Sequence, residues 1–268
     1  RNDSSLLSFI LPLEGASSFH IIASHSDSPS FKIKPGRALR SDCGILRASV
    51  EKYGSPIDSS WFDRPLSVSG RVFTESEEGI TGHLVYPKDL TLLIPSVAPH
   101  LLRREQGSAS LNVCDQMVPV IGFGEDGDLL WAAIADDLNL SRDQILSSDL
   151  YLCNAEEGRI WGAGKEFLSA PRLDDLACCY GSFIGFLDAV PDGGVVAVHC
   201  VFDNEEVGSR TLQGADSDFL KNVLERITAC LGLSRDSFLR AAAASFLISA
   251  DNAHAVHPNF EQLSDPEN

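Results

Sequence analysis

The sequence is poor in basic residues: 21 Lys and Arg stand against 38 Asp and Glu, which gives a formal net charge of -17. A protein with this charge repels phosphate groups and anionic lipids, so we expect neither nucleic acid nor a membrane among its main partners. The sequence also has no apolar run of membrane-spanning length. These absences favour a globular protein whose hydrophobic residues, 44% of the chain, form an internal core.

Signs of disulfide bonding are missing too. The seven cysteines are odd in number, contain no C-x-x-C pair, and in several cases lie within apolar stretches. This pattern predicts reduced core thiols in a cytoplasmic protein. A G-x-S-x-G motif is also absent, which argues against the nucleophilic serine of the α/β hydrolases.

The sequence does contain apolar segments that run into acidic or histidine side chains. The clearest, Val195 to Phe202, is typical of a strand buried on both faces of a parallel sheet, and Glu205 and Glu206 follow it. Two further segments behave alike: Phe19 to Ala23 leads to His25 and Asp27, and Ser245 to Ala250 leads to Asp251. Because ligands of open α/β sheets collect beyond the carboxyl ends of the strands, we expect these side chains to meet.

A further acid, Asp174, opens the apolar helical pattern from Leu176 to Val190. Histidine with carboxylates and without thiolates is a ligand set that suits zinc, manganese or cobalt in a catalytic role. Carboxylates in this number can serve two ions. If the backbone stays extended at Glu205 and Glu206, their side chains point in different directions, so that one can bind a metal while the other handles protons. An isolated acidic pair of this kind would more often be a solvated turn.

Four signature blocks carry a family resemblance. The blocks are His25–Pro29 with Phe31–Pro35, Pro171–Asp175, Asp203–Ser209, and Ser249–Asp251 with Ala253–Asn259. In order and content they resemble the aspartyl aminopeptidase family, which consists of metalloaminopeptidases with two zinc ions. The stretch between the first two blocks fits as well, so the resemblance spans nearly the whole chain.

The resemblance implies two divalent metal ions, expected to be zinc, and a role for each acid. His25 and Asp251 resemble ligands of the first metal, and Glu206 resembles a ligand of the second. Asp174 resembles the carboxylate that bridges the two ions, which in two-metal sites lie roughly 3.5–4 Å apart. Glu205 resembles the general base, which takes a proton from water and returns it to the leaving amine.

Supporting roles follow from the same resemblance. Asp27 resembles the carboxylate that orients the imidazole of the metal ligand two residues before it. His254 and His257 are expected to bind substrate or the tetrahedral oxyanion, although hydrogen bonding around the site is as good an interpretation. His100 resembles an insertion-domain histidine that reaches the active site of a neighbouring subunit.

The loop before the helical pattern from Leu176 to Val190 carries two expectations of its own. Arg172 and Asp175 are expected to orient Asp174 rather than to bind metal. The resemblance also implies a cis peptide bond between Asp174 and Asp175. His199, within the apolar strand, is interpreted as a hydrogen-bonded core residue.

The periodicity predicts an α/β fold with two parts. Residues 1–38 and 156–268 are expected to form the catalytic domain, with a mixed, largely parallel sheet flanked by helices. Residues 39–155 contain short alternating segments, such as 66–73 and 91–94, and are expected to form an inserted, mostly β dimerisation or lid domain. Its apolar residues, including Ile94, are expected to exceed what a small domain can bury.

The resulting interpretation is an aminopeptidase that removes an N-terminal residue, preferably Asp or Glu, from peptides. The expected assembly is a homo-oligomer in which dimers build a larger shell. Two alternatives stay open: an aminopeptidase of another specificity, and a catalytically silent structural subunit. The chain starts without Met and stops after the last block, so we expect a fragment whose final metal ligand lies in a C-terminal segment outside it.

Overall fold

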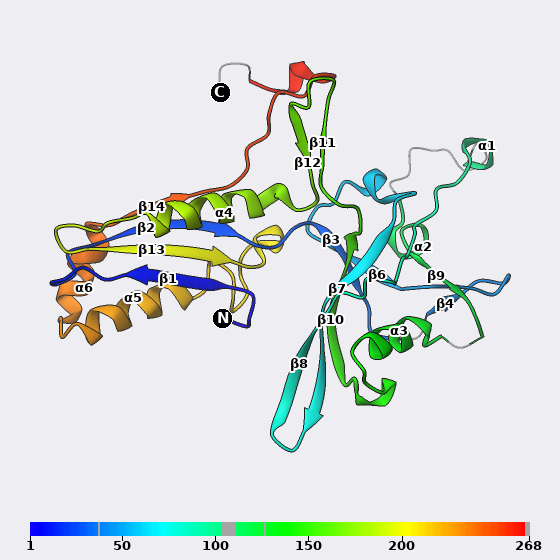
Figure 1. The fold of residues 1–268 in the computed structure, drawn as a ribbon, viewed down its shortest axis with the longest axis horizontal. Coiled ribbons are helices and arrows are strands. Elements are labelled where there is room, and N and C mark those ends of the chain that lie inside the picture. The colour runs from blue at the N-terminus through cyan, green and yellow to red at the C-terminus, as the bar shows by residue number, and fades with distance from the viewer. Residues whose placement is uncertain (37, 103–110, 126, 266–268) are drawn as a thin grey trace. The chain divides into compact units, whose positions relative to one another are not determined.

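A computed structural model describes residues 1–36, 38–102, 111–125 and 127–265 (Figure 1). The chain divides into two compact units, which are treated separately below. Unit 1 comprises residues 1–28 and 172–268, and unit 2 comprises residues 29–171. Within the described ranges, no helix combines the length and the hydrophobicity that crossing a bilayer requires.

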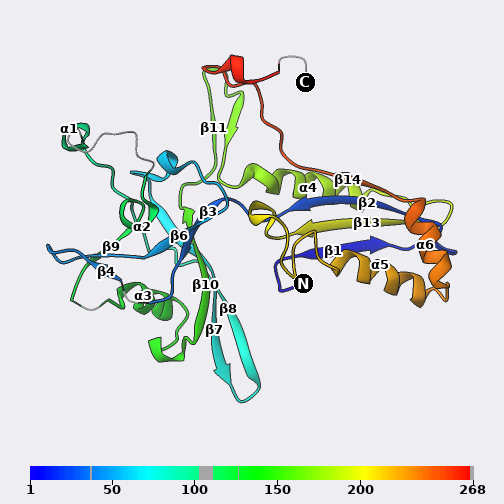
Figure 2. The same cartoon turned by 180° about the vertical axis from the view of Figure 1, so that it is seen from behind.

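Unit 1 is built on a four-stranded sheet with the order β1-β13-β2-β14 (Figure 2). The strands are β1 (Leu6–Ile10), β13 (Val195–Phe202), β2 (Ser18–His25) and β14 (Phe246–Ser249). β2 runs parallel to both of its neighbours, and only β1 is antiparallel to its partner. This mixed, largely parallel sheet confirms the predicted fold class. The register pairs Phe202 with His25 and Ser249 with Ala23, so three strands end at one edge of the sheet.

Three helices cover this sheet: α4 (Leu173–Leu187), α5 (Phe219–Cys230) and α6 (Arg235–Ala243). Ser234 caps α6, where its Oγ accepts the N–H of Ser237. Along β13 the side chains alternate between the two faces of the sheet. Those of Val196, Val198 and Cys200 pack into a core with residues of α5 and α6.

The intervening residue His199 lies on the opposite face, against α4. It is 1% exposed, and its Nε2 lies 3.0 Å from the Oγ of Ser182 in α4. The rings of Phe183 and Phe186 pack beside it. The interpretation of His199 as a core residue with a hydrogen-bonded ring is confirmed for Nε2, whereas its Nδ1 is buried without a hydrogen-bond partner among the described residues. Burial lowers the pKa of the imidazole.

Unit 2 consists mostly of antiparallel strands. Its largest sheet has the order β6-β3-β10-β7-β8. The strands of this sheet are β6 (Val50–Tyr53), β3 (Ser30–Ile33), β10 (Ser147–Asn154), β7 (Leu66–Ser76) and β8 (Gly79–Val85). The smaller sheets contain β4 (Leu39–Arg40), β5 (Ile45–Arg47) and β9 (Val120–Phe123), and the hairpin of β11 (Arg159–Trp161) with β12 (Phe167–Ser169).

Short helices complete the two units. The described α-helices of unit 2 are α1 (Pro99–Leu102), α2 (Val113–Gln116) and α3 (Leu129–Asp137). The 3-10 turns are η1 (Asp58–Trp61) and η2 (Arg142–Gln144) in unit 2, and η3 (Glu205–Val207) and η4 (Glu261–Leu263) in unit 1.

The compact units have different bounds from the expected functional domains. Residues 30–33 pair within the largest sheet of unit 2, so this unit begins at residue 29 instead of 39. The catalytic role of one part and the dimerisation role of the other stay predictions. Ile94, expected to need cover from outside, is fully buried in the core of unit 2, whereas Val97 and Leu101 are exposed.

Candidate metal centre

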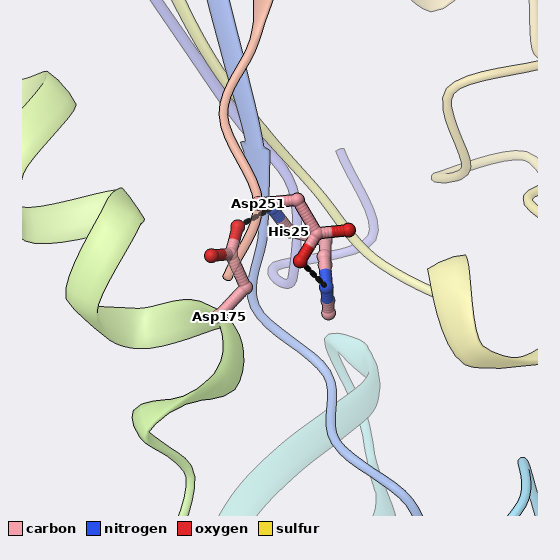
Figure 3. Close-up of side chains that lie close together, drawn as sticks. All are labelled: His25, Asp175 and Asp251. Atoms are coloured by element: carbon pink, nitrogen blue, oxygen red, sulfur yellow. Dashed lines mark hydrogen bonds and ion pairs between the residues drawn. The ribbon is translucent and has the colours of Figure 1, made fainter. Parts of the chain in front are cut away.

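Side chains from four segments of unit 1 meet at the edge where its parallel strands end. They come from the end of β2, the start of α4, the turn after β13 and the segment after β14. Figure 3 draws three of them, His25, Asp175 and Asp251. His25, Asp175 and Asp251 offer ligand atoms that all lie within 4.8 Å of one another, and so do His25, Glu205 and Glu206.

His25 is the residue that both groups share. It ends β2 and is only 5% exposed. Its Nε2 lies 3.4 Å from Asp174 Oδ1 and 3.7 Å from Asp251 Oδ1. Its Nδ1 lies 3.1 Å from the backbone oxygen of Asp27 and 3.4 Å from Asp27 Oδ1. Asp27 therefore engages one ring nitrogen and leaves Nε2 to face the carboxylates.

The neighbouring acids Asp174 and Asp175 lie in different surroundings. Arg172 adopts a left-handed conformation, and Asp174 and Asp175 have non-helical backbone angles, so the helix proper begins after them. The peptide bond between the two acids is cis, which confirms the expectation. Asp175 is fully buried, and its Oδ2 accepts the backbone N–H of His25 at 3.1 Å (Figure 3). The Asp174 side chain is 57% exposed.

Asp175 and Asp174 therefore differ in what their carboxylates can do: that of Asp175 positions His25, and that of Asp174 is open to solvent. The Asp175 carboxylate holds the backbone of His25, and its Oδ1 is buried without a hydrogen-bond partner among the described residues. The Asp174 carboxylate faces His25 Nε2 and solvent, where an ion can reach it. The geometry thus agrees with Asp174 as the ligand, although Asp175 also lies within ligand distance of His25 and Asp251.

The turn after β13 does not meet the condition under which the two glutamates would point in different directions. The backbone is not extended at the two glutamates: Asn204 is left-handed, with a φ of 62°, and Glu205 begins the 3-10 turn η3. The carboxylate of Asp27 holds this turn, because it accepts the N–H of Glu205 at 3.0 Å and that of Glu206 at 3.1 Å. One carboxylate therefore fixes both the imidazole of His25 and the turn that carries the glutamates.

The charges at this edge are crowded and mostly of one sign. Burial, followed by the charges of Glu205 and Asp27, raises the pKa of Glu206 to about 7. Burial and the charge of Asp251 raise the pKa of Asp174. Burial alone would lower the pKa of His25, but the hydrogen bond and charge of Asp27, helped by Asp175 and Asp251, raise it to about 9.

The raised pKa values of the acids follow from burial and from an excess of negative charge around one imidazole. A divalent cation would balance this negative charge, and one imidazole with several carboxylate oxygens is a donor set that suits zinc in a catalytic site. The residues present therefore fit the metal that the sequence predicts. The raised pKa of Glu206 agrees with a role as metal ligand, because a bound cation would stabilise its charged carboxylate. A general base that operates near neutral pH would show the same raised pKa.

Among the described residues of unit 1, His254 and His257 form no hydrogen bond or ion pair with this cluster. His254 and His257 are exposed in the segment after β14, where His257 accepts the N–H of Asn259 and packs near Phe260. His100 is exposed in α1, which belongs to unit 2. The roles of these histidines stay predictions.

Two supporting residues carry no signal in the sequence. The Sγ of Cys179, in α4, donates to the backbone oxygen of His25 at 2.9 Å. Asn252 donates to the backbone oxygen of Leu173 at 2.7 Å, which ties the segment that carries Asp251 to the start of α4. A cysteine in an apolar helix and an asparagine after a strand are common, so only the fold reveals these contacts.

Comparison with known proteins places this centre in a family. The whole chain, residues 1–268, matches the family model described as "Aminopeptidase I zinc metalloprotease (M18)". The chain therefore belongs to the M18 family of zinc metalloproteases, which confirms the resemblance seen in the signature blocks. The description of the family names zinc as its metal.

Particular relatives agree over the full chain. "Probable M18 family aminopeptidase 2" of Clostridium novyi is 39% identical over 276 residues, covering 100% of this chain and 64% of the relative. "Aspartyl aminopeptidase 1" of Schizosaccharomyces pombe is 35% identical over 296 residues, covering 100% and 62%. The solved structure of the S. cerevisiae mApe1 dodecamer is 26% identical with a TM-score of 0.81, covering 99% of this chain and 62% of that one. The chain thus spans just under two thirds of the length of these relatives.

Proposed function

We propose that the intact protein is an aminopeptidase whose catalytic centre is the His25 cluster. The observation that carries this proposal is the convergence of His25, Asp174, Asp251, Glu205 and Glu206 from four segments of one compact unit. In this assignment His25 and Asp251 would hold one zinc ion, Glu206 would hold a second, and Asp174 would be a ligand of both. When bound, the ions polarise the scissile carbonyl and make water acidic enough to ionise near neutral pH.

The protein side chains supply the proton transfers and the positioning. Glu205, at the exposed start of η3, is the general base that takes a proton from the attacking water and passes it to the leaving amine. Asp27 keeps Nδ1 of His25 engaged, so that Nε2 is the ligand atom. Asp175 fixes the backbone of His25 from the other side. His254 and His257 are proposed to contact the substrate.

The proposed substrates are peptides with an N-terminal Asp or Glu. The support is the name of the S. pombe relative, aspartyl aminopeptidase, at 35% identity. Because this protein itself carries a net charge of -17, recognition of an acidic side chain requires a local basic pocket. The seven free cysteines agree with a cytoplasmic location.

We also propose a homo-oligomer, built from dimers through unit 2, in which His100 enters a neighbouring cleft. The support is the dodecamer of the related mApe1 and the exposed apolar hairpin β11–β12, where Ile160, Trp161, Phe167 and Leu168 are all more than half exposed. An isolated two-stranded hairpin is marginal in water, so cover from another subunit would stabilise it. Light scattering of the intact protein tests this, and a monomer that cleaves a dipeptide would remove both the assembly and the role of His100.

The substitutions Glu205→Gln and Glu206→Gln test the catalytic assignment. Turnover of Asp and Ala anilides and zinc content per chain are measured for the intact protein and both variants. Glu205→Gln should lower kcat by about 10²–10⁴-fold while zinc content is unchanged, because it removes a base and no ligand. Glu206→Gln should lose one zinc.

The opposite zinc result would exchange the roles of the two glutamates. Equal turnover of both anilides would point to an aminopeptidase of another specificity. An unmodified protein that binds fewer than two metals and cleaves neither substrate would instead be a silent structural subunit.

A further inference from the structure

The turn that carries the glutamates depends on a second clamp, centred on Asn204. Asn204 is 8% exposed and lies between the last residues of β13 and η3. Its Oδ1 accepts two hydrogen bonds, from Thr211 Oγ1 at 2.7 Å and from Gln213 Nε2 at 2.8 Å. Its Nδ2 donates to Asp203 Oδ1 at 3.2 Å. The amide is therefore held on both its oxygen and its nitrogen.

The backbone of the same loop closes on itself around this side chain. The N–H of Ser209 donates to the backbone oxygen of Asn204 at 2.8 Å, and the N–H of Asp203 donates to that of Gln213 at 3.3 Å. Gly214 allows the loop to close so tightly, because a Cβ there would lie 2.1 Å from the backbone oxygen of Ser209. Residues 203–214 thus form a closed loop whose interior is the Asn204 amide.

Asn204 also sets the direction in which the chain leaves the strand. Its left-handed backbone, with a φ of 62°, changes the extended path of β13 into the turn that begins at Glu205. Asparagine is among the few residues with a side chain that adopt this conformation readily. A rotation at Asn204 would move both glutamates together, because Glu205 and Glu206 follow it directly.

We propose that Asn204 is a positioning residue that directs Glu205 and Glu206 at the metal site, with Thr211 and Gln213 as the donors that hold it. The inference rests on the proposed function, because it assumes that the two glutamates act at a metal. It adds a second support to that of Asp27. Asp27 binds the N–H groups of the glutamates from β2, whereas the Asn204 clamp fixes the turn from within its own loop.

Matched substitutions in the intact protein separate the clamp from the backbone conformation. Thr211→Val removes one hydroxyl donor at constant shape, and Thr211→Ser restores it. Asn204→Gly keeps the left-handed backbone accessible but deletes the amide. Thr81→Val, on exposed β8 of unit 2, is the control for the Thr to Val exchange itself. Each variant is loaded with Co²⁺ alone, and its visible absorption, Co²⁺ affinity, kcat and KM are recorded.

The clamp should affect the metal site as supporting hydrogen bonds around metal ligands usually do. Thr211→Val and Asn204→Gly are expected to weaken Co²⁺ binding or lower kcat by about 10–100-fold and to change the cobalt spectrum. Thr211→Ser and Thr81→Val should match the unmodified protein. Loss of thermal stability with an unchanged spectrum, affinity and kcat would overturn the inference, as would a Thr211→Ser variant as impaired as Thr211→Val.

The same measurements distinguish failure of the proposed aminopeptidase activity from failure of the Asn204 inference. If the unmodified protein binds Co²⁺ but cleaves no peptide, the proposed activity fails, while the spectrum and affinity still test the clamp. If the unmodified protein binds no Co²⁺, both fail together.

Discussion

The two compact units differ in how their charged side chains are arranged. In unit 1, the carboxylates of Asp174, Asp251, Glu205 and Glu206 gather around the single imidazole of His25. In unit 2, charges of opposite sign alternate across the face of the largest sheet. On this sheet Lys32 pairs with Asp149 at 2.9 Å and Arg71 with Asp149 at 3.8 Å, and Lys52 of β6 pairs with Asp58 of η1 at 2.7 Å.

This difference distinguishes charges that are paired within the protein from charges that are proposed to bind a cation. Burial would lower the pKa of Lys32, but the hydrogen bond and charge of Asp149 outweigh burial and raise it, so this pair is satisfied within unit 2. In unit 1 burial and the charges of neighbouring acids act in the same direction, and together they raise the pKa of Glu206 and Asp174. This excess of negative charge agrees with the proposed binding of a cation.

Neutralising one acid in each unit tests whether only the carboxylates of unit 1 serve a metal. Asp174→Asn keeps the shape of the side chain but removes the charge proposed to bridge two ions. Removal of several kcal/mol of charge stabilisation corresponds to a loss of about 1000-fold in kcat/KM, and zinc content should fall as well. Asp149→Asn in unit 2 is the control and should leave zinc content unchanged. An Asp174→Asn variant with full activity and two zinc ions would refute the bridging role.

Removal of the metal should loosen unit 1 alone. A ligand that binds only the folded state stabilises it by about 4 kcal/mol at 1000 times its dissociation constant. Chelation should therefore accelerate hydrogen exchange at the ends of β2 and β13 and in η3, but not in β7 or β10. Peptide-resolved hydrogen exchange, with and without zinc, measures this. An equal change in both units would show that the ion supports the fold as a whole.

The sequence could predict the site's position because it follows from strand patterns. The apolar runs of β2, β13 and β14 all end in ligand-type residues, and parallel pairing brings such ends to one edge of a sheet. The local geometry could not be predicted, because it depends on single backbone angles and distant partners. Asp174 and Asp175 are the same residue type side by side, yet one is open and the other is fully buried.

The same reason explains the other differences from expectation. The backbone is not extended at Glu205 because Asn204 is left-handed, and hydrogen bonds from Thr211 and Gln213, seven and nine residues away, hold that turn. Unit 2 begins before residue 39 because Ser30–Ile33 pairs with strands that follow it in the chain. Alternation identifies a strand but leaves its partners open.

A smaller loss of metal affinity and activity is expected from a substitution at Asp27, whose carboxylate accepts the backbone N–H groups of η3. Asp27→Asn keeps one acceptor oxygen but removes the charge next to His25 Nδ1 and one of the two acceptors for η3. Loss of such a partner typically costs 10–100-fold in metal affinity or activity. Zinc affinity and kcat of the intact variant are the measurements. A loss confined to thermal stability would make Asp27 a purely structural residue.

The smallest effect is expected from the paired charges of unit 2. Lys32→Met removes a partly exposed ion pair, so the free energy of unfolding should fall by less than about 1 kcal/mol. Because the folded-state pKa of Lys32 is raised above 10.5, the contribution is full below pH 10.5 and is lost as the pH rises beyond it. Chemical denaturation of both proteins at neutral and alkaline pH tests this, and a difference that grows with pH would contradict it.

The insertion of unit 2 between β2 and β13 also determines the order of events on the ribosome. Ser24 of β2 bonds to Cys200 of β13, a residue 176 positions later in the chain. At a synthesis rate of about 5–20 residues per second, β2 waits roughly 9–35 s for its central partner. Unit 2 ends at residue 171 and draws its sheets from its own strands, so it is complete during this interval. Phe19 and Ile21 of β2 are core residues in the folded unit 1, and until β13 is synthesised they lack this cover, so we expect β2 to be prone to aggregation in the nascent chain.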